Sequence, residues 1–234
     1  MIILFIFLPI SLLSQNVEII QQADIKNLPE AKIFAFIEPT TDTSDIRYLA
    51  TMSATAKNKK SVIENLYFDI RKEATQIGAN CYKIRSFERG GSQNEAILIL
   101  DCYVASESTL KENTKNHEDN VVFIFGGERE GEPSTSFKIN DEEIELNSGT
   151  YYKITLKPEE KIKISKGSIT GASITLRWEK DKKPAFYTLS GFGLAPMNQQ
   201  PMNGISFNTA NINKIQNISL GLLLTKLLKQ ANER

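Results

Sequence analysis

Two cysteines and one histidine are the side chains of this 234-residue chain best suited to redox, metal or acid–base chemistry. Cys81 and Cys102 do not form a C-x-x-C motif, the spacing that lowers a thiol pKa for redox work. His117 stands beside Glu118 and Asp119 in a polar stretch, where we expect a solvated side chain. Zinc binding and catalysis by a histidine base therefore lack their usual residues, and we predict no metal site and no cofactor.

The cysteines are better suited to a structural role. Cys81 begins a predicted strand that ends at Phe87, and Cys102 lies in a predicted strand over 96–104. If the chain turns about the Gly91–Ser92 link, the two cysteines lie directly opposite each other. We therefore expect a hairpin with a Cys81–Cys102 disulfide. Two free buried thiols are the main alternative, and a metal or redox pair is a minor one.

Carboxylates gather in three places, at Glu128/Glu130/Glu132, at Asp141–Glu143 and at Glu159/Glu160. Two carboxylates that face each other across a cleft can hydrolyse a glycoside. These clusters fall in predicted turns, where solvated charge is normal. An acid–base pair and a weak calcium site are therefore minor alternatives.

Four aromatic residues on predicted strands could bind a ligand: Tyr151, Tyr152, Trp178 and Tyr187. If exposed together, they would form a stacking platform for a sugar or a peptide. The alternative is that they belong to the core, where aromatic residues of strands are usually found.

The composition excludes some partners. Lysine and arginine number 28, as do aspartate and glutamate, so no basic excess exists to neutralise the phosphates of a nucleic acid. Hydrophobic residues make up 41% and charged residues 24%, which is typical of a folded protein.

The first 14 residues, MIILFIFLPISLLS, carry no charged side chain. This apolar run is shorter than the ~20 residues that a transmembrane helix needs, and it suits the core of a signal peptide. We predict a signal peptide at 1–14 and export to the periplasm, the outer membrane or the exterior. A buried N-terminal strand or an uncleaved anchor is the alternative. Export favours the disulfide, because paired cysteines in oxidising compartments are usually bonded.

Residues 15–104 are predicted to form a small α+β domain. Its helix begins at Ser61, with Glu64 at the capping-box spacing, and ends at Gly78. Strands are expected over 32–37 and 46–55, before the hairpin, whereas 17–29 reads as a weakly ordered lead or a short helix.

Residues 105–119 are polar and are predicted to be a linker between domains. From 120 to 194 the apolar residues alternate, which predicts an antiparallel β-sandwich. Its seven strands are expected at 121–125, 136–139, 143–146, 151–156, 161–165, 173–178 and 185–189.

Residues 195–234 are predicted to be an Asn- and Gln-rich tail with a short helix at 218–230. Leucines line one face of this helix, which is too short to span a membrane. Packing against its own domain, self-association and docking at a membrane surface are the three possibilities.

The string IRKEATQIGANCYKI, from Ile70 to Ile84, resembles the "AxxxGAN" helix-to-strand signature of small bacterial envelope domains, among them the Rcs-type outer-membrane sensors and the YbjQ-like families. The resemblance covers about 70 residues, and it implies a helix packed on a small sheet.

The run from Val121 to Leu156, with Gly149, Tyr151 and Pro158, resembles PEGA-like β-sandwich domains. Glu159 stands where that pattern has glycine. Both resemblances imply non-catalytic modules of exported proteins, common in Bacteroidetes-type envelopes. We therefore expect a non-enzymatic binding or structural protein whose partner is an envelope protein or a glycan. The alternative is a hydrolase that uses carboxylates of the sandwich or of an inter-domain cleft.

Overall fold

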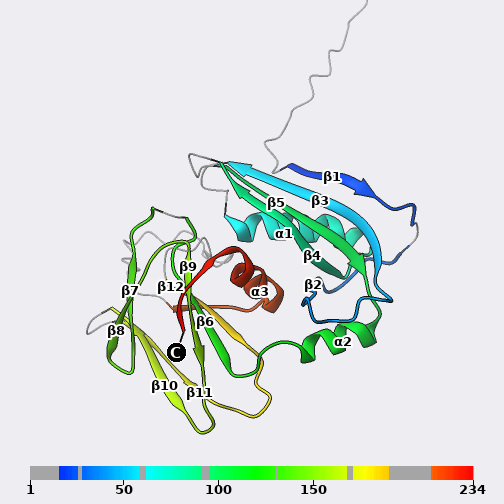
Figure 1. The fold of residues 1–234 in the computed structure, drawn as a ribbon. Helices are drawn as coiled ribbons and strands as arrows, with labels where there is room; N and C mark the ends of the chain where they lie inside the picture. Colours follow the sequence, from blue (N-terminus) through cyan, green and yellow to red (C-terminus); the bar gives the residue numbers. More distant parts are fainter. Residues whose placement is uncertain are drawn as a thin grey trace, which may run out of the picture.

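Three β-sheets and three helices form the part of the chain that the computed structural model describes, residues 16–25, 28–57, 62–90, 95–129, 131–167, 171–189 and 212–233. Figure 1 shows one sheet in the N-terminal half and the two others in the C-terminal half, with helix α3 (Ile218–Leu227) between the halves. The protein is α+β, as predicted. The predicted signal peptide, 1–14, lies outside the described residues.

Sheet A has five strands in the order β1-β3-β5-β4-β2. The predicted weakly ordered lead at 17–29 is wrong in part, because residues 16–22 form an edge strand that pairs antiparallel with β3. The strands of sheet A are β1 (Asn16–Gln22), β2 (Ala35–Phe36), β3 (Arg47–Lys57), β4 (Cys81–Arg89) and β5 (Glu95–Val104).

Helix α1 (Ile63–Gln76) covers one face of sheet A (Figure 1). Its apolar stripe, predicted from spacings of three and four residues, is buried against the sheet. The helix stops at the predicted place, because Gly78 adopts a φ of +88°, which glycine tolerates best. Ser61, the predicted cap, lies outside the described residues, and the side chain of the N-cap residue Val62 makes no capping hydrogen bond.

The hairpin of β4 and β5 has a register one residue away from the predicted one. Cys102 lies opposite Tyr82, and Cys81 lies opposite Tyr103. Because neighbouring residues of a strand point to opposite faces, Cys102 belongs to the core beneath α1 and Cys81 to a small cluster on the other face. Both thiols are free. The predicted Cys81–Cys102 disulfide is therefore wrong, and the alternative of two free buried thiols is the observed state.

The predicted linker, 105–119, contains helix α2 (Glu107–Lys115), which is tied to the edge of sheet A. Asn113 is 1% exposed, and its side chain accepts a hydrogen bond from the backbone N–H of Glu38 at 2.9 Å. It also donates to the carbonyl oxygen of Phe36 at 2.9 Å. The connection is thus a helix held by buried hydrogen bonds rather than an irregular chain.

All seven strands predicted for the second half are present, with bounds within one residue of those expected. They are β6 (Val121–Phe125), β7 (Thr135–Ile139), β8 (Glu142–Leu146), β9 (Thr150–Thr155), β10 (Lys161–Lys166), β11 (Ala172–Arg177) and β12 (Ala185–Leu189). Together with β13 (Ile212–Ile215) and β14 (Lys229–Glu233), they form sheet B, in the order β13-β12-β6-β9-β14, and sheet C, in the order β11-β10-β7-β8. One buried apolar cluster takes its side chains from both sheets.

The prediction of purely antiparallel pairing is wrong, because β12 runs parallel to β6 and β14 runs parallel to β9. The C-terminal segment supplies two strands of sheet B, β13 (Ile212–Ile215) and β14 (Lys229–Glu233), on either side of helix α3 (Ile218–Leu227). The predicted helix at 218–230 is therefore present, but its last residues are a strand.

Helix α3 packs inside the molecule, between sheet A with α1 on one side and sheet B on the other (Figure 1). Gly221 allows the close approach to sheet B, since a Cβ there would lie 2.3 Å from Cγ of Phe186. Leu220, Leu222 and Leu223 are at most 6% exposed. Of the three possibilities for this apolar face, packing within its own chain is the one observed.

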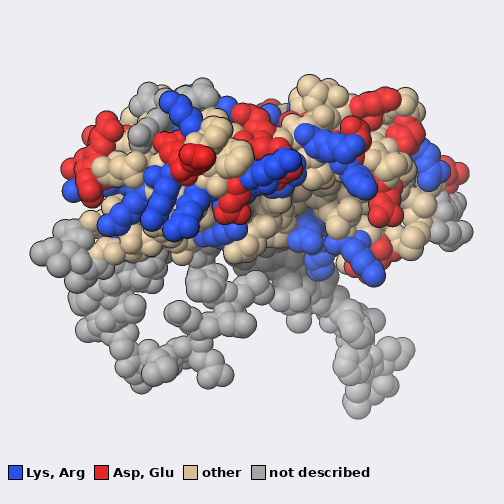
Figure 2. All heavy atoms as spheres, turned by 90° about the horizontal axis from the view of Figure 1, so that it is seen from below, with Lys and Arg blue, Asp and Glu red and all other residues tan. Residues whose placement is uncertain are grey.

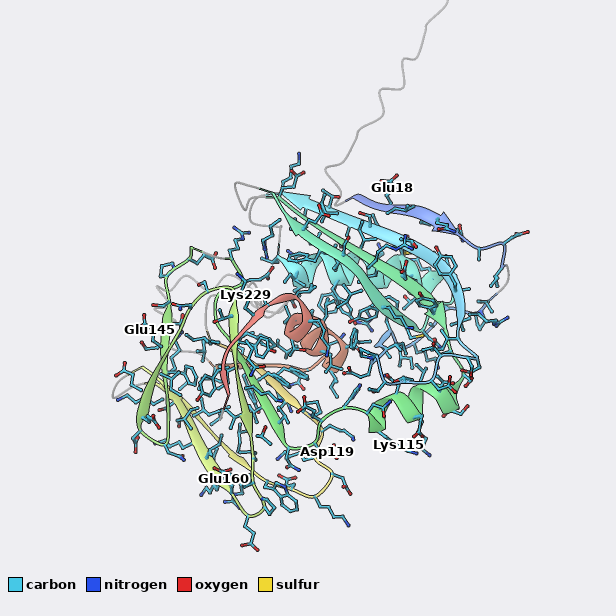
Figure 3. All side chains as sticks on the ribbon, viewed as in Figure 1. Glu18, Lys115, Asp119, Glu145, Glu160 and Lys229 are labelled. Atoms are coloured by element: carbon cyan, nitrogen blue, oxygen red, sulfur yellow. The ribbon has the colours of Figure 1, made fainter. Side chains whose placement is uncertain are left out.

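Acidic and basic side chains lie close to one another over the face shown in Figure 2. Figure 3 shows that charged residues such as Glu18, Glu145 and Glu160 are carried by outer strands and turns. None of the described helices is long and apolar enough to cross a membrane.

Candidate functional site

The aromatic residues predicted as a ligand platform do not form an exposed group. Tyr151, Tyr152 and Tyr187 are each 8% exposed, and Trp178 is half-buried against the cluster between sheets B and C. Tyr151 faces α3, whereas Tyr152 and Tyr187 face sheet C. The possible platform is therefore not formed and the core alternative is the observed state, because side chains alternate along β9 and its two tyrosines lie on opposite faces of sheet B.

The two thiols are unsuited to reaction. Burial raises the pKa of Cys81 to about 12, and burial together with the nearby carboxylate of Asp101 raises the pKa of Cys102 further. Because the thiolate is the reactive form, both cysteines are structural core residues.

His117 is half-buried rather than solvated, and neither ring nitrogen has a hydrogen-bond partner within the protein. Burial lowers its pKa, Lys183 lowers it further, and Asp119 acts in the opposite direction. Within the described ranges no group of three or more histidine, cysteine, aspartate or glutamate side chains could hold a metal ion.

A cavity of about 340 Å³ lies where sheet A, sheet B and α3 meet, and we call it the α3 groove. Two carboxylates and two ammonium groups line it: Glu38 after β2, Glu118 after α2, Lys153 on β9 and Lys226 on α3. Phe123 and Tyr151 of sheet B supply aromatic surface. Thr225 and Gln230 add side chains that can both donate and accept hydrogen bonds.

The charges of the α3 groove are arranged in two ion pairs. Nζ of Lys153 lies 2.9 Å from a carboxylate oxygen of Glu118, and Nζ of Lys226 lies 3.6 Å from one of Glu38. Burial raises the pKa of Glu38, the Lys226 ammonium opposes this, and the charge of Glu118 adds to it. The groove is thus electrically neutral as a whole but strongly polar.

Contacts within the protein hold several of the residues that line the groove. Asn113 of α2 holds the backbone of Glu38, as described above. Lys226 lies over the ring of Phe36, with Nζ 5.8 Å from the ring centroid. The hydroxyl of Tyr151 donates to the side-chain oxygen of Gln230 at 3.3 Å. The groove is therefore largely formed before any ligand arrives.

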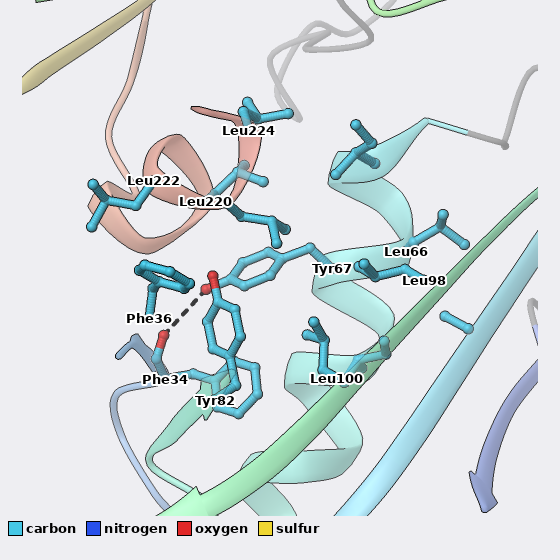
Figure 4. Close-up of a cluster of buried hydrophobic side chains, with 14 of the residues drawn as sticks. Phe34, Phe36, Leu66, Tyr67, Tyr82, Leu98, Leu100, Leu220, Leu222 and Leu224 are labelled. Atoms are coloured by element: carbon cyan, nitrogen blue, oxygen red, sulfur yellow. Dashed lines mark hydrogen bonds between the residues drawn. The ribbon is translucent and has the colours of Figure 1, made fainter. Parts of the chain in front are cut away.

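A cluster of aromatic rings holds the N-terminus of α3 (Figure 4). The rings of Phe34 and Tyr82 stack with centroids 4.8 Å apart. The hydroxyl of Tyr82 donates to the carbonyl oxygen of Ser219 at 2.8 Å, and that of Tyr67 donates to the carbonyl oxygen of Phe34 at 3.3 Å. These bonds satisfy buried hydroxyls and fix α3 against sheet A.

A buried carboxylate ties α1 to sheet B. Glu128 follows β6, is 5% exposed, and accepts a 2.6 Å hydrogen bond from the backbone N–H of Ile63, the first residue of α1. It also forms an ion pair with Arg89 at the end of β4. Glu128 therefore departs from the solvated state predicted for its acidic cluster. Glu130 lies outside the described residues.

Sequence reasoning missed the α3 groove and the Glu128 cluster. Their charged residues come from segments far apart in the chain and have no mutual spacing that marks a site. Glu38 follows the strand predicted over 32–37, which is observed as the shorter Ala35–Phe36, and that prediction does not say what the end of the strand would face.

Comparison with known protein families, with curated proteins and with solved structures finds no match. The two family resemblances therefore stay predictions.

Proposed function

We propose that this chain is an exported, non-catalytic protein of the cell envelope that acts as a binding or structural module. In this proposal an α+β module and a β-sandwich module made of sheets B and C are held in a fixed relation by α3. Its partner is an envelope protein or a glycan, and it docks in the α3 groove. The protein resides in the periplasm, on the outer membrane or outside the cell.

The observation that carries the proposal is the pairing of charges in the α3 groove. Each carboxylate already has an ammonium partner, so neither Glu38 nor Glu118 is an unpaired charge awaiting a metal or a reaction. Paired charges over aromatic surface suit a neutral or zwitterionic ligand with many hydrogen-bonding groups, because such a ligand can add bonds without leaving a buried charge unpaired.

The test places a bulky tryptophan side chain in the α3 groove. Thr225 is half-buried and lines the α3 groove, whereas Thr114 is an exposed residue of α2 outside it. Tagged wild-type, T225W and T114W proteins are used to capture partners from envelope extract and from a glycan array. We expect wild type and T114W to retain the same partner and T225W to lose it. A partner retained equally by all three would show that the groove is not the binding site.

A hydrolase is the second candidate, and Glu38 is the observation in its favour. A carboxyl group with a raised pKa beside a second carboxylate, here Glu118, is the arrangement of a glycoside hydrolase. The lysine partners argue against it, since each carboxylate is already engaged in an ion pair. We expect no sugar release from a polysaccharide panel. Release that E38Q abolishes and the control E142Q retains would establish the hydrolase.

A further inference from the structure

An open groove of about 730 Å³ runs along α1, and it shares no lining residue with the α3 groove. Its floor and one wall are Phe68, Arg71, Lys72 and Thr75, which follow one another at helical spacing and so share one stripe of α1. The other wall is the segment 30–32 that leads into β2. We call it the α1 groove.

The charges of the α1 groove are unbalanced. Lys32, Arg71 and Lys72 face a single carboxylate, that of Glu30. Within the described residues none of the three cations has an ion pair, in contrast to the lysines of the α3 groove. Since the chain as a whole carries equal numbers of acidic and basic residues, this local excess is a property of the groove and not of the surface in general.

An exposed aromatic ring lies among these cations. Phe68 is 37% exposed, one of few large hydrophobic side chains at the described surface. The guanidinium of Arg71 lies over its ring, with Cζ 5.9 Å from the ring centroid. Arginine in such a position can form paired hydrogen bonds with a carboxylate, while the rest of the ring offers apolar contact.

We infer that the α1 groove binds an anionic polysaccharide, with Lys32, Arg71 and Lys72 pairing with its carboxylates and Phe68 covering the apolar face of a sugar ring. The inference concerns a site separate from the α3 groove and does not depend on the function proposed for it.

Two features of the groove favour a polysaccharide over other polyanions. A peptide that docks by its backbone needs an open strand edge, but the N–H of Ala31 is already bonded to the carbonyl oxygen of Thr75 at 2.9 Å. A lipid bilayer presents a broad surface, whereas these cations and the ring line a concavity. A chain of charged sugar rings offers both the anions and the apolar ring faces that the groove can use.

The test measures binding of the full chain to polygalacturonate by calorimetry at low salt, with neutral dextran as the uncharged comparison. R71E/K72E reverses two charges of the groove, and K111E/K115E reverses two on exposed positions of α2. We expect R71E/K72E to weaken binding at least about tenfold, and K111E/K115E to change it by less than about twofold. F68A and K32E should each weaken binding by a smaller factor. All variants are first compared with wild type by circular dichroism.

Three results would overturn the inference. One is the absence of binding to polygalacturonate by folded wild-type protein. Another is equal weakening by R71E/K72E and K111E/K115E, which would mean that net charge alone is sensed. The third is tighter binding to polyglutamate or to phosphatidylglycerol vesicles, with F68A and wild type alike towards polygalacturonate, which would assign the groove to an acidic peptide or to a lipid surface.

Discussion

Replacement of Glu128 by glutamine should remove a pH dependence of stability. The carboxylate of Glu128 is buried between Arg89, which forms an ion pair with it, and the first N–H group of α1, which donates to it. Burial raises its pKa from 4.5 to about 7, and the charges of Arg89 and Arg129, with the bond from Ile63, act against that rise. Glutamine keeps the shape and the accepting oxygen but cannot ionise.

The sign and the magnitude follow from proton linkage. Between the two pKa values the folded protein keeps a proton on Glu128 that the unfolded chain has lost, so folding is favoured by low pH in this range. The contribution is fully present below about pH 4.5 and is lost as the pH rises through about 7. A difference of about 2.5 pH units at about 1.4 kcal/mol each gives a total loss of about 3–4 kcal/mol.

The assay is urea unfolding of wild type and E128Q at several pH values from about 5 to about 8, the range over which the contribution changes. His117 and the other titratable groups are present in both proteins, so their contributions drop out of the difference between the two free energies of unfolding. We expect wild type to lose about 3 kcal/mol relative to E128Q across the range. E142Q, at an exposed position of β8, should stay parallel to wild type. The reasoning is refuted if E128Q is parallel to wild type as well.

Three further predictions concern packing, hydrogen bonding and the thiols. Gly221→Ala forces a methyl group against the ring of Phe186 and should lower the free energy of unfolding by about 1–3 kcal/mol in urea titration. Asn113→Ala leaves buried backbone groups of the β2–α2 region without partners and should cost about 2 kcal/mol or more by the same measurement. Cys81 and Cys102 should both take up alkylating reagent without prior reduction, but only after denaturation, as followed by mass spectrometry.

Each of these has a result that would contradict it. G221A protein as stable as wild type would mean that α3 can move from sheet B at no cost. Thr114→Ala changes an exposed residue next to Asn113 and should alter stability by less than about 0.5 kcal/mol. An equal effect of the two substitutions would show that the buried hydrogen bonds of Asn113 do not stabilise the fold. Uptake of the alkylating reagent only after reduction would show that Cys81 and Cys102 form a disulfide.

The elements that the sequence predicts well are those specified by local periodicity. Helix α1 follows from its apolar stripe and from Gly78, and the strands β6 to β12 follow from the alternation of apolar residues between turns. Each of these signals is complete within a short stretch of chain. Their boundaries are therefore correct within one or two residues. An example is the turn between β7 and β8, which is marked by the positive φ values of Asn140 and Asp141.

The hairpin register shows where local reasoning stops. The composition of β4 and β5 predicts two paired strands, and both are present. The choice of partner residues depends on the bulge between Ile84 and Ser86 and on the packing of Tyr82 against α3, neither of which has a pattern in the sequence. An error of one residue then moves a cysteine to the other face, which changes a disulfide into two separate thiols.

The α3 groove could not be predicted for a related reason. Its four charged residues lie on four different segments, and they meet only because α3 enters between sheets A and B. The leucines of α3 predict a buried face, but the same face could also serve as an oligomer contact or meet a membrane surface. The place of α3 is decided by its contacts with residues distant in sequence. Tyr82 donates a hydrogen bond to the carbonyl oxygen of Ser219, and Gly221 packs against the ring of Phe186.

The α3 groove, and with it the function proposed for it, depends on the docking of α3 between the two halves of the chain. Lys226 and Thr225 enter the groove only when α3 has docked, and α3 can dock only on a surface that both halves of the chain provide. Truncation after 217 should therefore abolish binding at the α3 groove. It should leave the α1 groove intact as long as sheet A and α1 remain folded, because Arg71 and Lys72 lie on a face of α1 that lines a different cavity. Binding to polygalacturonate by such a truncated chain, with no capture of the partner of the α3 groove, would separate the two sites within one protein.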